Sequence, residues 1–490
     1  MSNAAKFPTF SRWGRFLWRR AKPWVRPVVF TLVCIVTLVA LVVAEENYRT
    51  GRAWENYKAA ARARGEKLTL AELAPPPVPD DQNFAMTPLL KPLYGEPAYE
   101  SELSNRLELS DGQFSMLDDL GSRDTSKGAD WAKLEEYLHQ PDAMADLKKH
   151  DGELAEITQA LRRPYSRFPI SYDQHPIFSL RLVHVSPLIA LGRLFLLRAC
   201  AEFADGQSDQ AMSDAVSLLR LSQVVRNEPI YMSKLVEVVL IRLGTSLIWV
   251  GLADRRWNES QLATLQDELQ KIDLLTQFSA AQQGERVFFI DTLEWLAEQD
   301  SAQRVKTYRS FLASNQKVDW ATELLRMPHF ILNKASVAGS EYFDQYLLPI
   351  LDLGERRFYP ERAALAAKIF ETQFKRDPFK GLWQTSSLFY PQIAYAQTSL
   401  DEAILACALE RYHLSQGNYP EKLDVLVPQY ISRLPHDLVS GKPLIYQLSD
   451  KGRFILYSTG WTGKDNQGKL KSAGDFDIRT DNWVWQYPPP

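Results

Sequence analysis

The chain has 490 residues, of which 45% are hydrophobic and 24% are charged, so it is neither disordered nor of low complexity and is long enough for more than one domain. Seven of its 57 basic residues and none of its 60 acidic residues lie within residues 1–44, so the rest of the chain is acidic, which excludes a nucleic-acid-binding body. Cys34, Cys200 and Cys407 are too few and too scattered for a disulfide framework or a zinc site made of cysteines.

The first predicted element is a membrane helix over residues 27–44. Pro27 to Ala44 holds no charge and is rich in Val, Leu and Ile, and a helix of this length spans about 27 Å, close to the hydrocarbon thickness of a bilayer. The basic residues in 1–26 predict a cytoplasmic N-terminal tail, because cationic flanks resist translocation, and place the remaining body across the membrane. A cleaved signal peptide is the alternative, since Val42 and Ala44 resemble a processing site.

Residues 45–99 are predicted to form a helical stalk followed by a Pro-rich connector. Charges at short intervals favour continuation of the helix to about residue 74, where consecutive prolines stop it. The stretch from Leu73 to Tyr94 contains six prolines, which favours an extended connector. Asn83, Phe84 and Leu89 in this stretch could dock on the body.

Residues 100–392 are predicted to form an α-helical body. Apolar residues recur at spacings of three and four on both sides of Asp205-Gly206, which predicts two antiparallel helices joined by a short turn. The segment from Phe203 to Leu219 is similar to one tetratricopeptide-type unit, but a single unit does not make an array. We therefore expect an irregular helical bundle or solenoid.

Further helices are expected in the same body. Asn258 is a predicted N-cap, with Gln261 three residues on as its capping-box partner. The longer helices are expected at Met232 to Ala253, Glu259 to Lys271 and Ala280 to Gln299, and short ones around Trp131 to Leu138 and Gly152 to Arg162.

Residues 393–490 predict a small α+β module. An apolar helix from Tyr395 to Gln416 ends at Gly417, and two strand-like runs, Pro443 to Leu448 and Arg453 to Ser458, flank a turn and predict a β-hairpin. Trp483 and Trp485 alternate onto one face of a later strand. They are expected to cover the hairpin as core, with an exposed carbohydrate or peptide platform as the alternative.

This module resembles the globular part of the major pseudopilins of type II secretion. In both, a helix, a Gly-x-Tyr-Pro turn, a short helix, a Pro/Asp/Gly/Pro loop and a hairpin ending in Tyr-Ser-x-Gly follow in this order. The matching residues are Gly417, Tyr419, Pro420, Leu423, Leu426, Pro435, Asp437, Gly441, Pro443, Tyr446, Tyr457, Ser458 and Gly460. The loop from Asp437 to Gly441 is one residue longer than in that family, and a long body separates the module from the membrane helix, so the assembly interface of a pilin is missing.

The resemblance implies a location and a metal. The whole chain resembles large bacterial envelope proteins anchored in the inner membrane with a periplasmic body. Major pseudopilins bind calcium in the loop after the hairpin, where this chain offers oxygen donors of the kind that calcium prefers. The candidate calcium ligands are Asp465, Asp475, Asp477 and Asp481, and the alternative is a solvated acidic loop. No other cofactor is implied.

The sequence contains only weak indications of catalytic chemistry. The seven histidines show no metal-ligand spacing, and the chain contains no P-loop, G-x-G-x-x-G, G-x-S-x-G or C-x-x-C motif, so no nucleotide partner is expected. Asp291, Glu294 and Glu298 share one face of a predicted helix, where paired carboxylates could act as acid and base. A solvated or ion-paired helix face is the simpler interpretation.

Two functions follow as hypotheses. The first is a non-enzymatic scaffold or docking component that contacts inner-membrane lipid and envelope protein partners, linked to a secretion or pilus-like assembly. The second is a periplasmic hydrolase whose site is assembled from residues distant in sequence. A cleft with clustered titratable groups favours the enzyme, and a flat apolar patch favours the scaffold.

Overall fold

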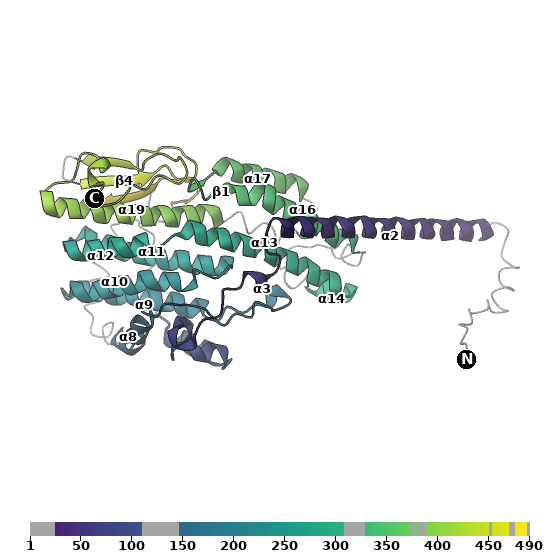
Figure 1. Ribbon diagram of the computed structural model, residues 1–490, viewed down its shortest axis with the longest axis horizontal. Helices are drawn as coiled ribbons and strands as arrows, with labels where there is room; N and C mark the ends of the chain where they lie inside the picture. Colours follow the sequence, from purple (N-terminus) through teal and green to yellow (C-terminus); the bar gives the residue numbers. More distant parts are fainter. Residues whose placement is uncertain are drawn as a thin grey trace. The chain divides into compact units, whose positions relative to one another are not determined.

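A computed structural model describes the chain as mainly helical with a small antiparallel sheet (Figure 1). The described residues are 25–109, 147–307, 329–374, 379, 389–449, 453–469 and 476–487. Two compact units are present: a smaller unit of Met1–Arg64 with Leu296–Ala338, and a larger unit of Gly65–Trp295 with Gly339–Pro490. The predicted short helix around Trp131 to Leu138 and residues 1–24 of the predicted basic tail lie outside the described residues, while Val25 and Arg26 already belong to a helix.

The smaller unit is dominated by α2 (Val25–Ala63), a helix of 39 residues. Its most apolar window is entirely unburied, and Leu41, for example, keeps 63% of its surface. Water disfavours such a surface and the hydrocarbon of a bilayer accepts it. The predicted apolar helix over 27–44 is therefore confirmed as a helix long and apolar enough to span a membrane, and it runs on without a break into the predicted stalk.

Beyond the apolar stretch, α2 packs against the start of α16 (Phe330–Tyr342). The side-chain carbonyl of Asn47 accepts a hydrogen bond from the N–H of Phe330 at 2.8 Å, and Lys334 Nζ lies 2.7 Å from Glu46 Oε2. Hydrogen bonds from Lys334 and Arg49 hold the pKa of Glu46 below its usual range. The short helix α14 (Ser301–Thr307) belongs to the same unit.

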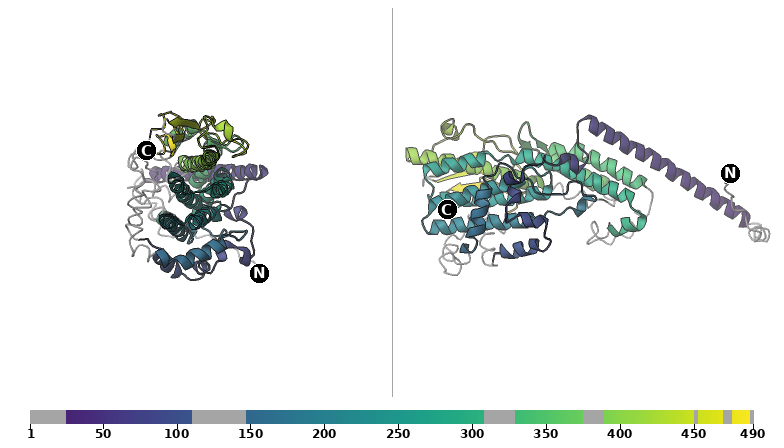
Figure 2. Two further views of the ribbon diagram at one scale, coloured as in Figure 1. Left: turned by 90° about the vertical axis from the view of Figure 1, so that its left-hand side faces the viewer. Right: turned by 60° about the horizontal axis from the view of Figure 1, so that its bottom comes forward.

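The larger unit is a layered set of long helices. They are α9 (Val185–Ala204), α10 (Ser208–Ser222), α11 (Tyr231–Ala253), α12 (Glu259–Gln270), α13 (Leu274–Glu298, assigned to this unit up to Trp295) and α19 (Phe389–Gln416). α9, α10 and α11 pack against one another, and α11 and α12 both pack against α19. α19 lies between these helices and the sheet (Figure 1 and Figure 2).

Local sequence signals explain these helices. The predicted antiparallel pair is confirmed as α9 and α10, and Gly206 between them adopts a left-handed φ of 72°, which glycine takes without strain. Asn258 caps α12 as predicted, because its Oδ1 accepts from the N–H of Gln261 at 2.9 Å. The side-chain Oε1 of Gln261 in turn accepts from the N–H of Asn258, also at 2.9 Å. α11 is apolar enough to span a membrane by composition, but 78% of that window is buried, so it is a core helix.

The Pro-rich stretch is docked rather than free. It contains α3 (Leu70–Leu73) and three 3-10 turns, η1 (Asp80–Gln82), η2 (Phe84–Met86) and η3 (Lys91–Tyr94). Asn83 fastens it, because its amide donates to the carbonyl of Arg167 and its Oδ1 accepts from the N–H of Arg167, both at 2.8 Å. Phe84 is buried beside this anchor, whereas a solvated extended connector would leave it exposed.

The remaining elements are short, except for α17 with 14 residues. α4 (Tyr99–Arg106) and α8 (Asp151–Ala160) pack against α9. The others are η4 (Ile177–Ser179), η5 (Gln223–Val225), η7 (Phe343–Leu347), η8 (Leu348–Ile350), β1 (Leu351–Asp352), β2 (Arg357–Phe358), α17 (Pro360–Gln373) and η10 (Leu423–Leu426). β1 and β2 form a two-stranded antiparallel ribbon that ends in a tight turn.

The C-terminal sheet contains the predicted hairpin. Its strands are β3 (Ile445–Ser449), β4 (Arg453–Ser458) and β5 (Trp483–Tyr487), in the antiparallel order β3-β4-β5. Trp483 and Trp485 pair with β4 and are almost fully buried, and Trp483 packs against Tyr395 of α19 at a ring separation of 5.7 Å. They are therefore core residues, and the alternative of an exposed aromatic platform is wrong.

Candidate functional site

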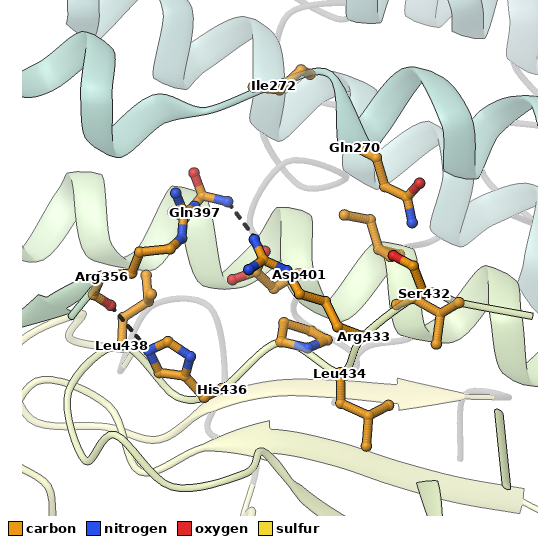
Figure 3. A pocket seen from close by; sticks show the side chains of 13 residues that line it. Gln270, Ile272, Arg356, Gln397, Asp401, Ser432, Arg433, Leu434, His436 and Leu438 are labelled. Carbon is orange, nitrogen blue, oxygen red and sulfur yellow. Dashed lines mark hydrogen bonds between the residues drawn. The ribbon is translucent and has the colours of Figure 1, made fainter. Parts of the chain in front are cut away.

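A polar cavity of about 300 Å³ opens in the larger unit against α19 (Figure 3). We call it the Asp401 cavity. Its walls are α19, the end of α12, the turn between β1 and β2, and the loop of residues 431–438. The polar side chains that line it are Gln270, Arg356, Gln397, Asp401, Ser432, Arg433 and His436. The lining therefore contains two arginines, Arg356 and Arg433, and one carboxyl group, that of Asp401.

Asp401 is held in place by its own helix. Gln397 lies one turn earlier on α19, and its Nε2 donates to Asp401 Oδ1 at 3.1 Å. The Oε1 of Gln397 accepts from the backbone N–H of Leu274 at 3.1 Å, which satisfies one of the free N–H groups at the start of α13. The same glutamine thus joins α13 to α19 and orients the aspartate.

The environment of Asp401 changes its acidity. Only 9% of the residue is exposed, and burial raises the pKa of its carboxyl to about 7. The hydrogen bond from Gln397 and the charges of Arg356 and Arg433 oppose this rise without cancelling it. With its pKa in this range the carboxyl is a hydrogen-bond donor when protonated and an acceptor when ionised.

Arg356 brings its charge to the cavity from a constrained turn. Its φ is 49°, a left-handed value that costs a side-chain-bearing residue free energy. Its Nη1 lies 3.1 Å from Asp273 Oδ1, and its carbonyl accepts a hydrogen bond from His436 Nε2 at 3.2 Å. Burial raises the pKa of Asp273, but hydrogen bonding from Thr276 and the charge of Arg356 outweigh burial and lower it.

Arg433 is the less restrained cation. It is exposed, and among the described residues its guanidinium forms no hydrogen bond or ion pair, although its charge acts on Asp401. Figure 3 shows its side chain extended toward Asp401. A guanidinium in this position is available to bind a ligand's anionic group.

The loop that carries Arg433 and His436 is fixed by Asp437. This buried carboxylate accepts backbone hydrogen bonds from Val439 at 2.8 Å, Ser440 at 2.9 Å and Thr459 at 3.0 Å. The loop is also joined to β2, because the carbonyl of Leu438 accepts from the N–H of Phe358 at 2.7 Å. The cavity wall is therefore built on ordered backbone, as a binding site requires.

The predicted calcium ligands that the structure describes accept hydrogen bonds from residues close to them in the sequence. Asp465 Oδ1 accepts from Tyr457 Oη at 3.1 Å, Asp481 Oδ2 accepts from the N–H of Asp477 at 2.8 Å, and Asp477 Oδ1 accepts from the N–H of Arg479 at 2.9 Å. Asp475 lies outside the described residues. Within the described ranges, no group of three or more His, Cys, Asp and Glu side chains could hold a metal. The calcium site stays a prediction.

The carboxylate face predicted on α13 has a structural role at Asp291. Its Oδ1 lies 2.9 Å from His175 Nδ1, and its Oδ2 accepts from the N–H of Ile177 at 2.9 Å. This aspartate fastens a loop to the helix, in agreement with the ion-paired interpretation.

A buried polar cluster was not anticipated. His184 is fully buried, with Nε2 3.2 Å from Glu228 Oε1, and Ser233 donates to the other oxygen of the same carboxylate. The ring of His184 stacks on Phe168 at 4.0 Å. No sequence motif marks these residues, because His184 directly precedes α9 whereas Glu228 and Ser233 lie just before and at the start of α11.

Comparison of the chain with protein-family models, curated proteins and solved structures found no match.

Proposed function

We propose that the larger unit binds a small anionic ligand in the Asp401 cavity and is held at a membrane by α2. The observation that carries this proposal is the exposed Arg433, whose guanidinium has no hydrogen-bond or ion-pair partner among the residues that the structure describes, beside a buried carboxyl with a pKa of about 7. Arg433 can donate two parallel hydrogen bonds to a carboxylate or a sulfate. Protonated Asp401 can donate one more, whereas ionised Asp401 repels the anion.

The test is ligand binding to the full chain in detergent micelles. Isothermal titration with succinate and with sulfate at pH 6, at constant ionic strength, should show binding that Arg433→Gln weakens about tenfold, the loss of one charge-assisted interaction. Arg479→Gln is the matched control, because Arg479 is an exposed arginine outside the cavity. Equal affinities of wild type and Arg433→Gln, or no binding of either anion, would rule the proposal out.

The docking function expected from the sequence is a second proposal. β3 is an edge strand, which can accept a further strand, and Leu448 on it is 42% exposed. Val425 on η10 is 52% exposed. In this proposal the chain is anchored in a bacterial inner membrane with a periplasmic body, and the module contacts a partner in a secretion or pilus-like assembly, as the pseudopilin resemblance implies.

Photocrosslinking tests the docking proposal. A photoreactive residue at Leu448 or Val425 in native membranes should give a discrete adduct with an envelope protein, and one at the exposed control position Lys368 of α17 should not. Mass spectrometry of the same preparation should recover the N-terminal peptide uncleaved. Adducts that are equal at all three positions would contradict a docking surface on the module.

The hydrolase hypothesis draws on the same cavity. A carboxyl with a pKa of about 7 can exchange a proton at neutral pH, as general acid–base catalysis requires. Turnover of peptide or glycan substrates that Asp401→Asn abolishes would support an enzyme. Turnover that survives this substitution would exclude Asp401 from catalysis.

A further inference from the structure

A second concave region lies in the larger unit, on a face made by the end of α8, the loop of residues 161–166, α10 and α12. It consists of two cavities of about 270 Å³ and about 370 Å³ that share Leu161 and Arg220. We call it the Arg220 groove. None of its lining residues belongs to the Asp401 cavity.

The groove is cationic although the chain around it is acidic. Five cations line it (Arg162, Arg163, Arg220, Arg226 and Lys271), against Asp209 and Glu268. Glu268 is already neutralised, because Arg220 contacts both of its oxygens, at 2.5 and 3.2 Å, and Lys271 Nζ lies 3.2 Å from one of them. The groove therefore has spare positive charge.

Arg162 and Arg226 carry this spare charge. Both are exposed, and neither guanidinium forms a hydrogen bond or ion pair with the part of the chain that the structure describes. Arg226 is fixed at its backbone, since its carbonyl accepts from the buried Lys234 Nζ at 2.9 Å. Such arginines suit a phosphate or carboxylate.

The rest of the groove lining includes hydroxyl groups and an aromatic ring. One cavity is rich in hydroxyl groups, among them Thr158, Ser213, Ser217 and Thr264, and the other holds the ring of Tyr165, which is 47% exposed. Ser217 and Thr264 already donate to backbone carbonyls of their own helices, and Thr158 Oγ1 lies 3.2 Å from Ser217 Oγ, so their oxygens face a ligand as acceptors. The exposed aromatic ring offers an apolar face. Together these features match a ligand with many hydroxyl groups and apolar C–H faces, which is a sugar.

We propose that the Arg220 groove binds an acidic saccharide, a sugar unit that carries a phosphate or a carboxylate. The acid lies against Arg226 and the sugar ring against Tyr165, which line the same cavity, while Arg162 and the hydroxyl-lined wall belong to the neighbouring cavity that shares Arg220. This proposal does not depend on ligand binding in the Asp401 cavity.

The test uses the full chain in detergent micelles in an Arg433→Gln background, which removes the cation of the Asp401 cavity. The probes are glucose 6-phosphate, glucuronate, glucose and inorganic phosphate, titrated at constant ionic strength. We expect one of the acidic sugars to bind at least tenfold more tightly than both glucose and phosphate, and which of them binds identifies the acid. Binding of neither acidic sugar, or equally tight binding of phosphate, overturns the proposal.

Variants locate the site. Arg162→Gln/Arg226→Gln should weaken the acidic sugar about tenfold or more, and Tyr165→Ala should weaken the sugar without changing the affinity for phosphate. Arg479→Gln is the charge-matched control and should leave all affinities unchanged. Because the substituted side chains are exposed, the unfolding midpoint of each variant should equal that of the background protein. Full affinity in the double variant overturns the assignment to this groove.

Discussion

Lys234 and Glu237 form an ion pair in the interior of the larger unit. Lys234 Nζ lies 2.8 Å from Glu237 Oε2, and the two side chains are 1% and 0% exposed. The same ammonium donates to the carbonyls of Val225 and Arg226, and Gln223 donates to Glu237 Oε1 at 3.0 Å. The pair therefore joins α11 to η5 and to Arg226, and Gln223 and Arg226 also line the Arg220 groove.

Removal of one partner should be costly. Lys234→Met leaves Glu237 buried without its counter-charge, and burial already raises the pKa of that carboxyl, so we expect a loss of about 3–5 kcal/mol in the free energy of unfolding. The double variant Lys234→Met/Glu237→Leu should regain much of this loss. Urea denaturation followed by circular dichroism measures both. Equal stability of Lys234→Met and wild type would show that the pair contributes nothing.

Anion binding in the Asp401 cavity should depend on pH. Protonated Asp401 favours an anion and ionised Asp401 repels it, so sulfate affinity should fall as pH rises through about 7. Asp401→Asn keeps a neutral donor at this position, so its sulfate affinity should fall less than that of wild type between pH 6 and pH 8. Sulfate does not titrate in this range. Parallel pH profiles for wild type and variant would contradict the role of Asp401.

Glu202 should make the protein less stable in alkali. Burial raises its pKa to about 8, Asp214 and Asp151 add to the rise, and Arg198 opposes it. Because the folded state holds this proton more tightly than the unfolded state, the stabilisation is present at low pH and is lost as pH rises from about 4.5 through about 8. Glu202→Gln should lose less stability across this window. Thermal unfolding at pH 5, 7 and 9 measures the difference, which should grow with pH.

A glycine on α13 should resist substitution. A Cβ at Gly284 would lie 1.7 Å from the backbone carbonyl oxygen of Pro229, closer than atoms can approach, so the helix would have to shift. We expect Gly284→Ala to cost about 2 kcal/mol or more, in the range of overpacked cores. Gly152→Ala is the control, because Gly152 has open space on α8, and it should be neutral or slightly stabilising. Chemical denaturation of both variants gives the comparison.

Much of the fold follows from local signals. The uncharged run in residues 27–44 gave the apolar helix, apolar spacing around Gly206 gave α9 and α10, and Asn258 with Gln261 gave the start of α12. Each depends on residues within a few turns of one another, so propensity and capping chemistry suffice. The Pro-rich stretch contains 3-10 turns where an extended connector was expected, and the expected docking is confirmed, because Asn83 finds its hydrogen-bond partner in Arg167.

The candidate sites depend on what packing brings together. Residues far apart in the sequence meet at the Asp401 cavity, and α19 carries Asp401 in a stretch that is buried on all sides, so hydrophobic periodicity gives no sign of it. Its pKa is set by desolvation and by charges from other segments, above all those of Arg356 and Arg433. The sequence by itself determined the apolar N-terminal helix, the other helices with local signals and the hairpin, since these arise from near neighbours. Only the tertiary structure decided which polar groups share a cavity, because burial and Coulomb interactions act across space rather than along the chain.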